Sequence, residues 1–178
     1  MAELSPLETL DEADVSAGTR TGGCRVLALV APPTTESEDW APRAAHRLAS
    51  RWVSEGHRVI LADGGLGQPS LHHVAGIPNR EGIVDVALYG ASLARVSRLF
   101  AGYVLITAGT VVADPTAVAR ARRWHRVAAG VAEAGTMLLI YLRDKEPWAP
   151  AFLDSVDEIV LLENKGESPT GYSGPNNG

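Results

Sequence analysis

Three charged residues follow apolar segments that we predict to be buried strands. Asp63 comes directly after one such run, and Asp144 and Lys145 follow a later one. Carboxylates in these places can hold a divalent cation, and a lysine can neutralise a phosphate. One hypothesis is therefore a nucleotide-binding site built from these three residues, with Lys145 as its cation because Lys165 is the only other lysine. The alternative reading of Asp63 is an acid that shapes the turn after its strand.

Metal and cofactor chemistry finds little support in the residue types. The chain has one cysteine, Cys24, which excludes an internal disulfide and a multi-cysteine metal site. His72 and His73 are adjacent, and adjacent residues of a helix do not face the same pocket. We therefore expect no metal site and no cofactor.

A cluster of arginines lies on a helix that we predict over residues 115–134. Arg122 and Arg126 share one face of that helix, as do Arg123 and Arg126, because residues three or four apart are neighbours. These three arginines are a candidate surface for an acidic protein partner. The alternative is an ordinary solvated helix face.

The overall composition limits the classes of partner. The chain has 178 residues, of which 46% are hydrophobic and 21% charged, and its formal net charge is −5. This length is enough for one domain with its own core. An acidic balance gives no support for binding nucleic acid or an anionic membrane surface. No apolar run approaches the ~20 residues that span a bilayer, and the N-terminus lacks a signal-peptide pattern, so we expect a cytoplasmic protein without membrane insertion.

Short apolar runs alternate with amphipathic segments along the chain. The predicted strands cover residues 26–30, 59–63, 103–108, 137–142 and 158–162. The predicted helices cover residues 40–55, 71–75, 83–88, 93–100, 115–134 and 150–155. Strands that are apolar throughout are typical of a sheet buried on both faces. The alternation predicts an α/β fold in which a mostly parallel sheet lies between two layers of helices.

The composition changes at both ends of the chain. Residues 1–23 carry five acids and one base, so we expect a flexible acidic tail in which a short helix from Pro6 to about Asp14 can form. Residues 164–178 are rich in glycine, serine, proline and asparagine, which predicts a disordered tail. One α/β domain over residues 24–163 lies between them.

Several motifs together resemble one protein family. They are RLA at 47–49, GHRVILAD at 56–63, QPSLH at 68–72, GIPN at 76–79 and GIVDV at 82–86. In type and spacing they resemble the bacterial tyrosine kinases of capsule and exopolysaccharide synthesis. These kinases belong to the deviant-Walker P-loop ATPases, together with the septum-placement and plasmid-partition ATPases. The resemblance covers about residues 26–162 and implies a three-layer sandwich of the P-loop NTPase type.

The phosphate-binding loop of that family is degenerate in this chain. On the family's frame, the catalytic lysine falls on Ala41, the magnesium-binding hydroxyl on Pro42 and the preceding glycine on Trp40. The segment before them also contains two prolines, Pro32 and Pro33, and three acids, Glu36, Glu38 and Asp39. A proline lacks a backbone donor, and three carboxylates repel a triphosphate. Acids do favour the N-terminus of a helix, so we expect this loop to cap its helix.

The sequence therefore predicts a catalytically inactive relative of these kinases, with no catalytic residue, that binds other proteins as an adaptor or regulator. The resemblance implies a link to exopolysaccharide assembly or export, in which the partner is a membrane-anchored chain-length regulator or a related ATPase. Two alternatives stay open. One is a weak or atypical nucleotide-binding ATPase or kinase that uses Asp63, Asp144 and Lys145. The other is a self-assembling structural subunit, in which the acidic N-terminal segment pairs with the arginine-bearing helix of another copy.

Overall fold

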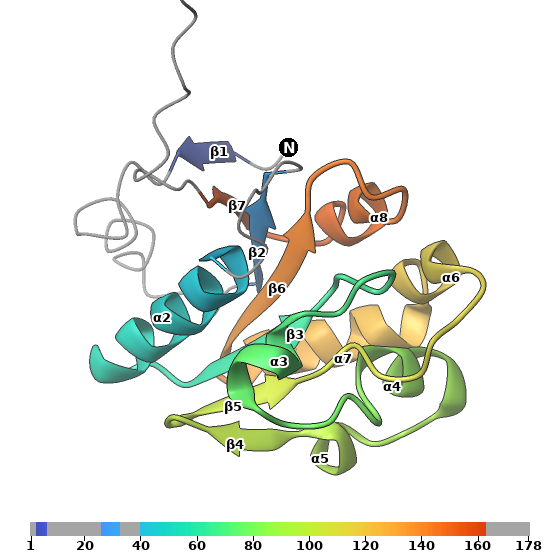
Figure 1. Cartoon of the computed structure of the whole chain (residues 1–178), viewed down its shortest axis with the longest axis horizontal. Coiled ribbons are helices and arrows are strands. Elements are labelled where there is room, and N and C mark those ends of the chain that lie inside the picture. The colour runs from blue at the N-terminus through green and yellow to red at the C-terminus, as the bar shows by residue number, and fades with distance from the viewer. Residues whose placement is uncertain (1–2, 7–25, 33–39, 163–178) are drawn as a thin grey trace, which may run out of the picture.

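The described residues form one seven-stranded sheet. A computed structural model of the chain describes residues 3–6, 26–32 and 40–162. The strand order is β1-β7-β2-β6-β3-β5-β4 (Figure 1), and all neighbours run parallel except β4, which is antiparallel to β5. The strands are β1 (Glu3–Pro6), β2 (Val26–Ala31), β3 (Val59–Asp63), β4 (Arg98–Phe100), β5 (Tyr103–Ile106), β6 (Met137–Arg143) and β7 (Glu158–Leu161).

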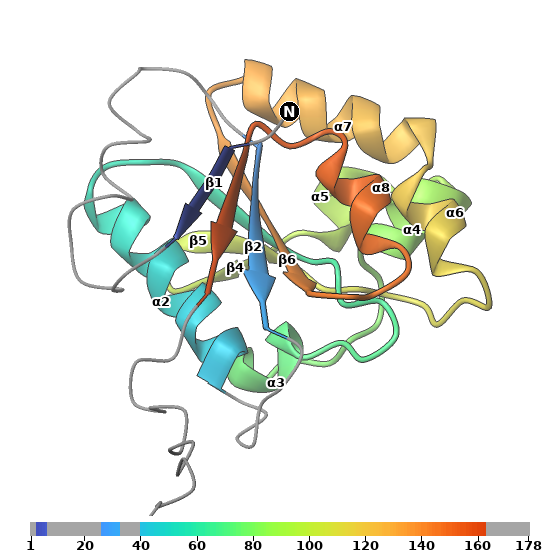
Figure 2. The ribbon, with the colours of Figure 1, turned by 90° about the horizontal axis from the view of Figure 1, so that it is seen from above.

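Helices cover both faces of this sheet (Figure 2). One face carries α2 (Trp40–Ser54) and α3 (Leu71–Ala75). The opposite face carries α4 (Ile83–Tyr89), α5 (Leu93–Val96), α6 (Pro115–Ala119), α7 (Arg122–Glu133) and α8 (Ala149–Leu153). Residues of β2 belong alternately to the core on one face and the core on the other, because successive side chains of a strand point to opposite faces. The expected sandwich with a mostly parallel central sheet is confirmed. Each helix in the described ranges falls short of the length and apolar character that a bilayer crossing needs.

A buried histidine ties α2 to both α3 and the sheet. His46 Nε2 lies 2.9 Å from the backbone oxygen of Leu71, and its Nδ1 lies beside the hydroxyl of Tyr103. A carbonyl oxygen can only accept, so Nε2 carries the proton and Nδ1 accepts from Tyr103. Burial lowers the pKa of His46, which keeps the ring neutral in this arrangement. The contact fixes α3 at the end of β3.

Two predicted helices are interrupted in the structure. The expected helix over 93–100 ends with α5, and β4 follows it because Ala101 and Gly102 take positive φ values of 48° and 86° and turn the chain into β5. The expected helix over 115–134 is divided into α6 and α7 by Ala121, whose backbone is extended. Val118 and Trp124 are both fully buried, yet a single straight helix would point them about 120° apart. The break lets both side chains reach the same core.

Of the predicted N-terminal tail, the structure describes residues 3–6. Residues 3–6 form β1 along the outer edge of β7, in parallel register from Glu3 opposite Glu158 to Pro6 opposite Leu161. The expected helix therefore does not begin at Pro6, because the backbone there is extended and can pair with the free edge of β7. The rest of the predicted N-terminal tail and the predicted C-terminal tail over 164–178 lie outside the described residues.

Candidate functional site at the carboxyl edge of the sheet

The carboxyl ends of β2, β6 and β3 meet at one edge of the sheet, which we call the carboxyl edge. The connection after β2 leads to β3 on one side, and the connection after β6 leads to β7 on the other. In open α/β sheets, ligands bind outside the strand ends where the direction of connection reverses in this way. Asp63 ends β3 here, and Arg143 ends β6. The carboxyl edge is therefore the candidate functional site.

The Asp63 carboxylate is fully buried and accepts three backbone hydrogen bonds. Its Oδ1 accepts from the N–H of Gly65 at 2.9 Å. Its Oδ2 accepts from the N–H groups of Ser70 at 3.0 Å and Leu71 at 3.1 Å, where α3 begins. The Ser70 side chain makes no capping hydrogen bond, so Asp63 supplies the cap of this helix. The carboxylate thus closes residues 64–70 into a fixed loop.

A second carboxyl group, Glu146, reaches the same edge, although no sequence motif marks it. Its Oε2 is buried without a hydrogen-bond partner among the residues that the structure describes. Burial raises the pKa of Glu146 to about 7, and the Asp63 charge adds to the rise while Arg143 opposes it. Burial also raises the pKa of Asp63 to about 6, against the lowering effect of its backbone donors and Arg143. Arg143 in turn donates to Gln68 Oε1 at 2.9 Å. The edge therefore holds two interacting carboxyl groups beside one guanidinium.

The stability of the protein should fall between about pH 5 and about pH 8, and Glu146→Gln should weaken this dependence. The folded pKa of Glu146 lies above the usual 4.5, so the folded state binds the proton more tightly than the unfolded chain does. The unfolding free energy therefore decreases as the pH rises through the folded pKa. With allowance for partial exposure, we expect this side chain to contribute about 1–2 kcal/mol of the decrease.

Urea denaturation across that pH range measures the effect. Asp144→Asn is the matched control, because Asp144 is an exposed carboxylate two positions away. Profiles of equal slope for the wild type and Glu146→Gln would contradict the assignment of the proton to Glu146.

Packing explains two of the glycines that follow Asp63. A Cβ on Gly64 would lie 2.7 Å from the backbone oxygen of Tyr141, and one on Gly67 would lie 2.8 Å from the ring of Trp148. Trp148 Nε1 also donates to the Gly64 oxygen at 2.9 Å. The loop is therefore held between β6 and Trp148. These two glycines therefore allow other segments of the same chain to pack closely against the loop.

The structure places the other two residues of the hypothetical nucleotide site at the surface. β6 runs to Arg143, one residue further than expected, and the next N–H, that of Asp144, donates to the Ala31 oxygen at 2.8 Å. The Asp144 carboxylate accepts from the N–H of Lys145 at 2.9 Å. Both side chains are exposed. No hydrogen bond or ion pair within the described ranges joins either of them to Asp63.

The first turn of α2 occupies the place where the resemblance puts the phosphate-binding lysine and hydroxyl. The helix begins at Trp40, which is partly buried, and both Ala41 and Pro42 are buried. Ala41 belongs to the core between α2 and the sheet. Pro32 is the last described residue after β2, and the expected loop acids Glu36, Glu38 and Asp39 lie outside the described residues.

The motifs at 76–86 fasten the loop that follows β5. Asn79 Oδ1 accepts from the N–H of Gly109 at 2.7 Å, and its Nδ2 donates to the Gly109 oxygen at 3.2 Å. Asp85 accepts from the N–H of Gly82 at 2.9 Å and from the hydroxyl of Thr110 at 2.7 Å. These side chains hold the loop after β5 in place, and this structural role accounts for their spacing in the sequence.

The three arginines of the candidate partner surface are all exposed on α7. They do not have the same surroundings. Arg123 Nη2 donates to the Gly90 oxygen at 3.0 Å, at the C-terminal end of α4. Arg122 and Arg126 have no described hydrogen bond or ion pair, so these two are available to another molecule.

Comparison with known proteins identifies the fold. No protein-family model and no curated protein matches the chain. Among solved structures, the kinase domain of the Escherichia coli tyrosine kinase ETK matches with a TM-score of 0.74 at 16% identity over 83% of this chain. The VpsO (VC0937) kinase domain matches with a TM-score of 0.74 at 17% identity over 88% of this chain. The Pyrococcus furiosus cell division ATPase MinD matches with a TM-score of 0.59 at 19% identity over 78% of this chain.

These relatives are longer than the part of them that this chain matches. The chain spans 58% of the ETK domain, 77% of the VpsO domain and 59% of MinD. At such identities the likeness concerns the fold. The chain therefore has the P-loop NTPase fold of the bacterial tyrosine kinase and MinD type, as the motifs of the sequence predict.

Proposed function

We propose that the chain is a catalytically inactive P-loop ATPase that acts by binding proteins. The observation that carries this proposal is the engagement of Asp63. Both of its oxygens accept backbone hydrogen bonds from the chain itself, and the side chain is sealed from solvent. A carboxylate held in this way shapes a loop and has no exposed oxygen for a metal ion.

The start of α2 supports the same proposal. A triphosphate requires a cation and a magnesium-binding hydroxyl beside its oxygens. The corresponding positions carry the side chains of Ala41 and Pro42, which are buried and can supply neither group. Lys145 is exposed, and no hydrogen bond or ion pair in the described ranges joins it to Asp63, so it does not replace the missing cation within these contacts.

The proposed partner is a protein of exopolysaccharide assembly or export, namely a membrane-anchored chain-length regulator or a related ATPase, and the proposed location is the cytoplasm. The motif resemblance and the likeness to tyrosine kinase domains support this choice. The test is titration of the chain with the cytoplasmic segment of such a regulator. We expect the same affinity with and without magnesium-ATP.

Calorimetric titration with magnesium-ATP and magnesium-ADP tests the loss of nucleotide binding. We expect no binding tighter than about 1 mM, which corresponds to about 4 kcal/mol. Micromolar affinity would overturn the proposal. Lys145→Ala and Lys165→Ala form a matched pair for that case, because they are the only lysines in the chain. Binding that is lost in Lys145→Ala alone would identify the alternative site of Asp63, Asp144 and Lys145.

A further inference from the structure

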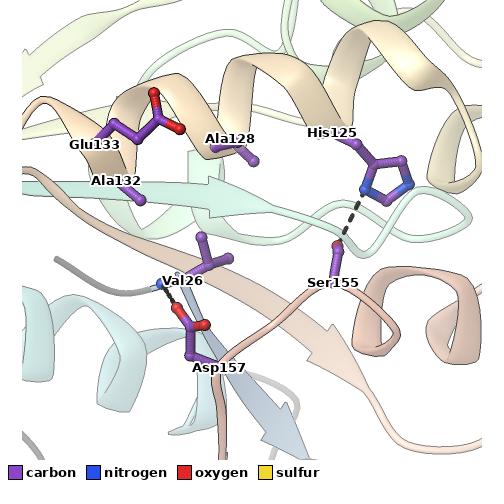
Figure 3. A pocket seen from close by; sticks show the side chains of 8 residues that line it. Val26, His125, Ala128, Ala132, Glu133, Ser155 and Asp157 are labelled. Atoms are coloured by element: carbon purple, nitrogen blue, oxygen red, sulfur yellow. Dashed lines mark hydrogen bonds between the residues drawn. The ribbon is translucent and has the colours of Figure 1, made fainter. Parts of the chain in front are cut away.

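A groove lies at the end of the sheet opposite to the carboxyl edge (Figure 3). It has a volume of about 520 Å³ and lies between α7 and the amino ends of β2 and β7. Three alanines of α7 line it together with Glu133, and Asp157 lines the facing side. The Asp157 carboxylate accepts from the N–H of Val26 at 2.9 Å, and His125 contacts the Ser155 hydroxyl at 3.0 Å. Glu133 alone among the charged lining groups has no described partner.

The outer face of α7 continues from this groove. We define the α7 face as Arg126, Ala129, Gly130 and Glu133, all of which are exposed. These residues share one side of the helix, because the spacings of three, four and seven each return near the same direction. The two charges lie about 10 Å apart along the axis, with the two small residues midway between them. No described ion pair engages either charge.

The order of charges along α7 is unfavourable for the helix itself. Arg122 and Arg123 occupy its first turn and Glu133 its last, whereas a helix dipole favours acids first and bases last. Each misplaced charge costs about 0.3–1 kcal/mol in an exposed helix. The hydrogen bond from Arg123 to the Gly90 oxygen compensates one of these charges within the chain, whereas Arg126 and Glu133 have no described partner.

We propose that the α7 face binds the α7 face of a second copy of this chain, with the two helices antiparallel about a twofold axis. Ala129 of each copy then lies against Gly130 of the other, and their small side chains permit an interaxial distance of about 8 Å. Each Arg126 meets Glu133 of the other copy, at the mouth of the groove that Asp157 also lines. Both charges on both copies are paired by this one rotation.

Charge complementarity selects a second copy over other occupants. A uniformly acidic partner would neutralise Arg126 but repel Glu133, and a uniformly basic partner would do the reverse. A surface with the opposite order of charges satisfies both, and an antiparallel copy of the same helix has that order. The contact is confined to one helix and its groove, so it is small, and we expect a reversible dimer of micromolar or weaker affinity.

Analytical ultracentrifugation of charge-exchange variants tests the proposal. Arg126→Glu and Glu133→Arg each place like charges together twice in the dimer, so each should raise the dissociation constant at least about tenfold. The double variant restores opposite charges and should return within about threefold of the wild type. Arg47→Glu, an exposed reversal on α2, is the control and should change nothing. A chain that stays monomeric at millimolar concentration, or a double variant as weak as the single ones, overturns the proposal.

A cross-linking experiment tests the centre of the contact. Ala129→Cys in a Cys24→Ser background should form a disulfide-linked dimer on mild oxidation, because only close Cα atoms can be bridged. Glu55→Cys, exposed at the end of α2, should remain largely monomeric in the same background. Equal yields from the two positions would show random collision and contradict the twofold arrangement. Neither readout involves nucleotide, so this inference and the proposed loss of nucleotide binding fail independently.

Discussion

Gly82→Ala should lower the free energy of unfolding by about 3 kcal/mol or more. A Cβ at Gly82 would lie 1.8 Å from the Thr107 oxygen and 2.5 Å from the Thr107 carbonyl carbon. These are backbone atoms at the end of β5, and they cannot move aside as a flexible side chain would. The same oxygen accepts from the N–H of Ile83 at 2.9 Å. The added methyl group therefore separates α4 from the sheet.

Gly130→Ala is the matched control for this substitution. Gly130 is in the middle of α7, has nothing within 4 Å of an added Cβ, and has no positive φ. Alanine is a better helix former there, so we expect a gain of about 0.5–1 kcal/mol. Urea denaturation at submicromolar protein concentration compares the two variants as monomers. A loss below about 1 kcal/mol for Gly82→Ala would mean that the contact with Thr107 relaxes easily.

Asp63→Ala should cost about 3 kcal/mol and should loosen residues 64–75 locally. The substitution leaves the N–H groups of Gly65, Ser70 and Leu71 without their acceptor in a buried loop. Each orphaned buried donor costs about 1–3 kcal/mol, and removal of a buried carboxyl group offsets part of the sum. Asp63→Asn keeps one oxygen acceptor and should lie between the alanine variant and the wild type.

Two measurements separate this structural role from a role in catalysis. Denaturant unfolding gives the loss of stability, and hydrogen exchange should show faster exchange in peptides that cover Gly65 and residues 70–71. Asp144→Ala is the control, since the exposed Asp144 should change stability by no more than about 0.5 kcal/mol. Unchanged exchange in Asp63→Ala would contradict the role of Asp63 as the acceptor that closes the loop.

The motifs that carry the sequence resemblance are largely those that build loops. Asn79 and Asp85 bind the segment after β5, and Asp63 binds the segment after β3. A resemblance carried by such residues predicts the fold well, because the same loop-forming hydrogen bonds build the same architecture. It says less about activity, which in that family depends on phosphate-binding residues that the resemblance aligns with Trp40, Ala41 and Pro42.

The sequence alone is enough to predict the layered α/β fold and most of its elements. Runs such as 26–30 and 137–142 are apolar at every position, and only a sheet covered on both faces buries such strands completely. The helix from Trp40 is equally predictable, because its apolar residues recur on one side. The absence of a lysine and a hydroxyl in its first turn is also a property of the sequence.

The tertiary structure decided where the helices break and which polar groups meet. The division between α6 and α7 lets Val118 and Trp124 pack into the same core. Local helix propensity does not reveal which side chains must share a core. Glu146 meets Asp63 because β6 lies next to β3 in the sheet, and strand order is not visible in spacing along the chain. The raised pKa of each carboxyl follows from burial, which exists only after distant segments have packed together and excluded water.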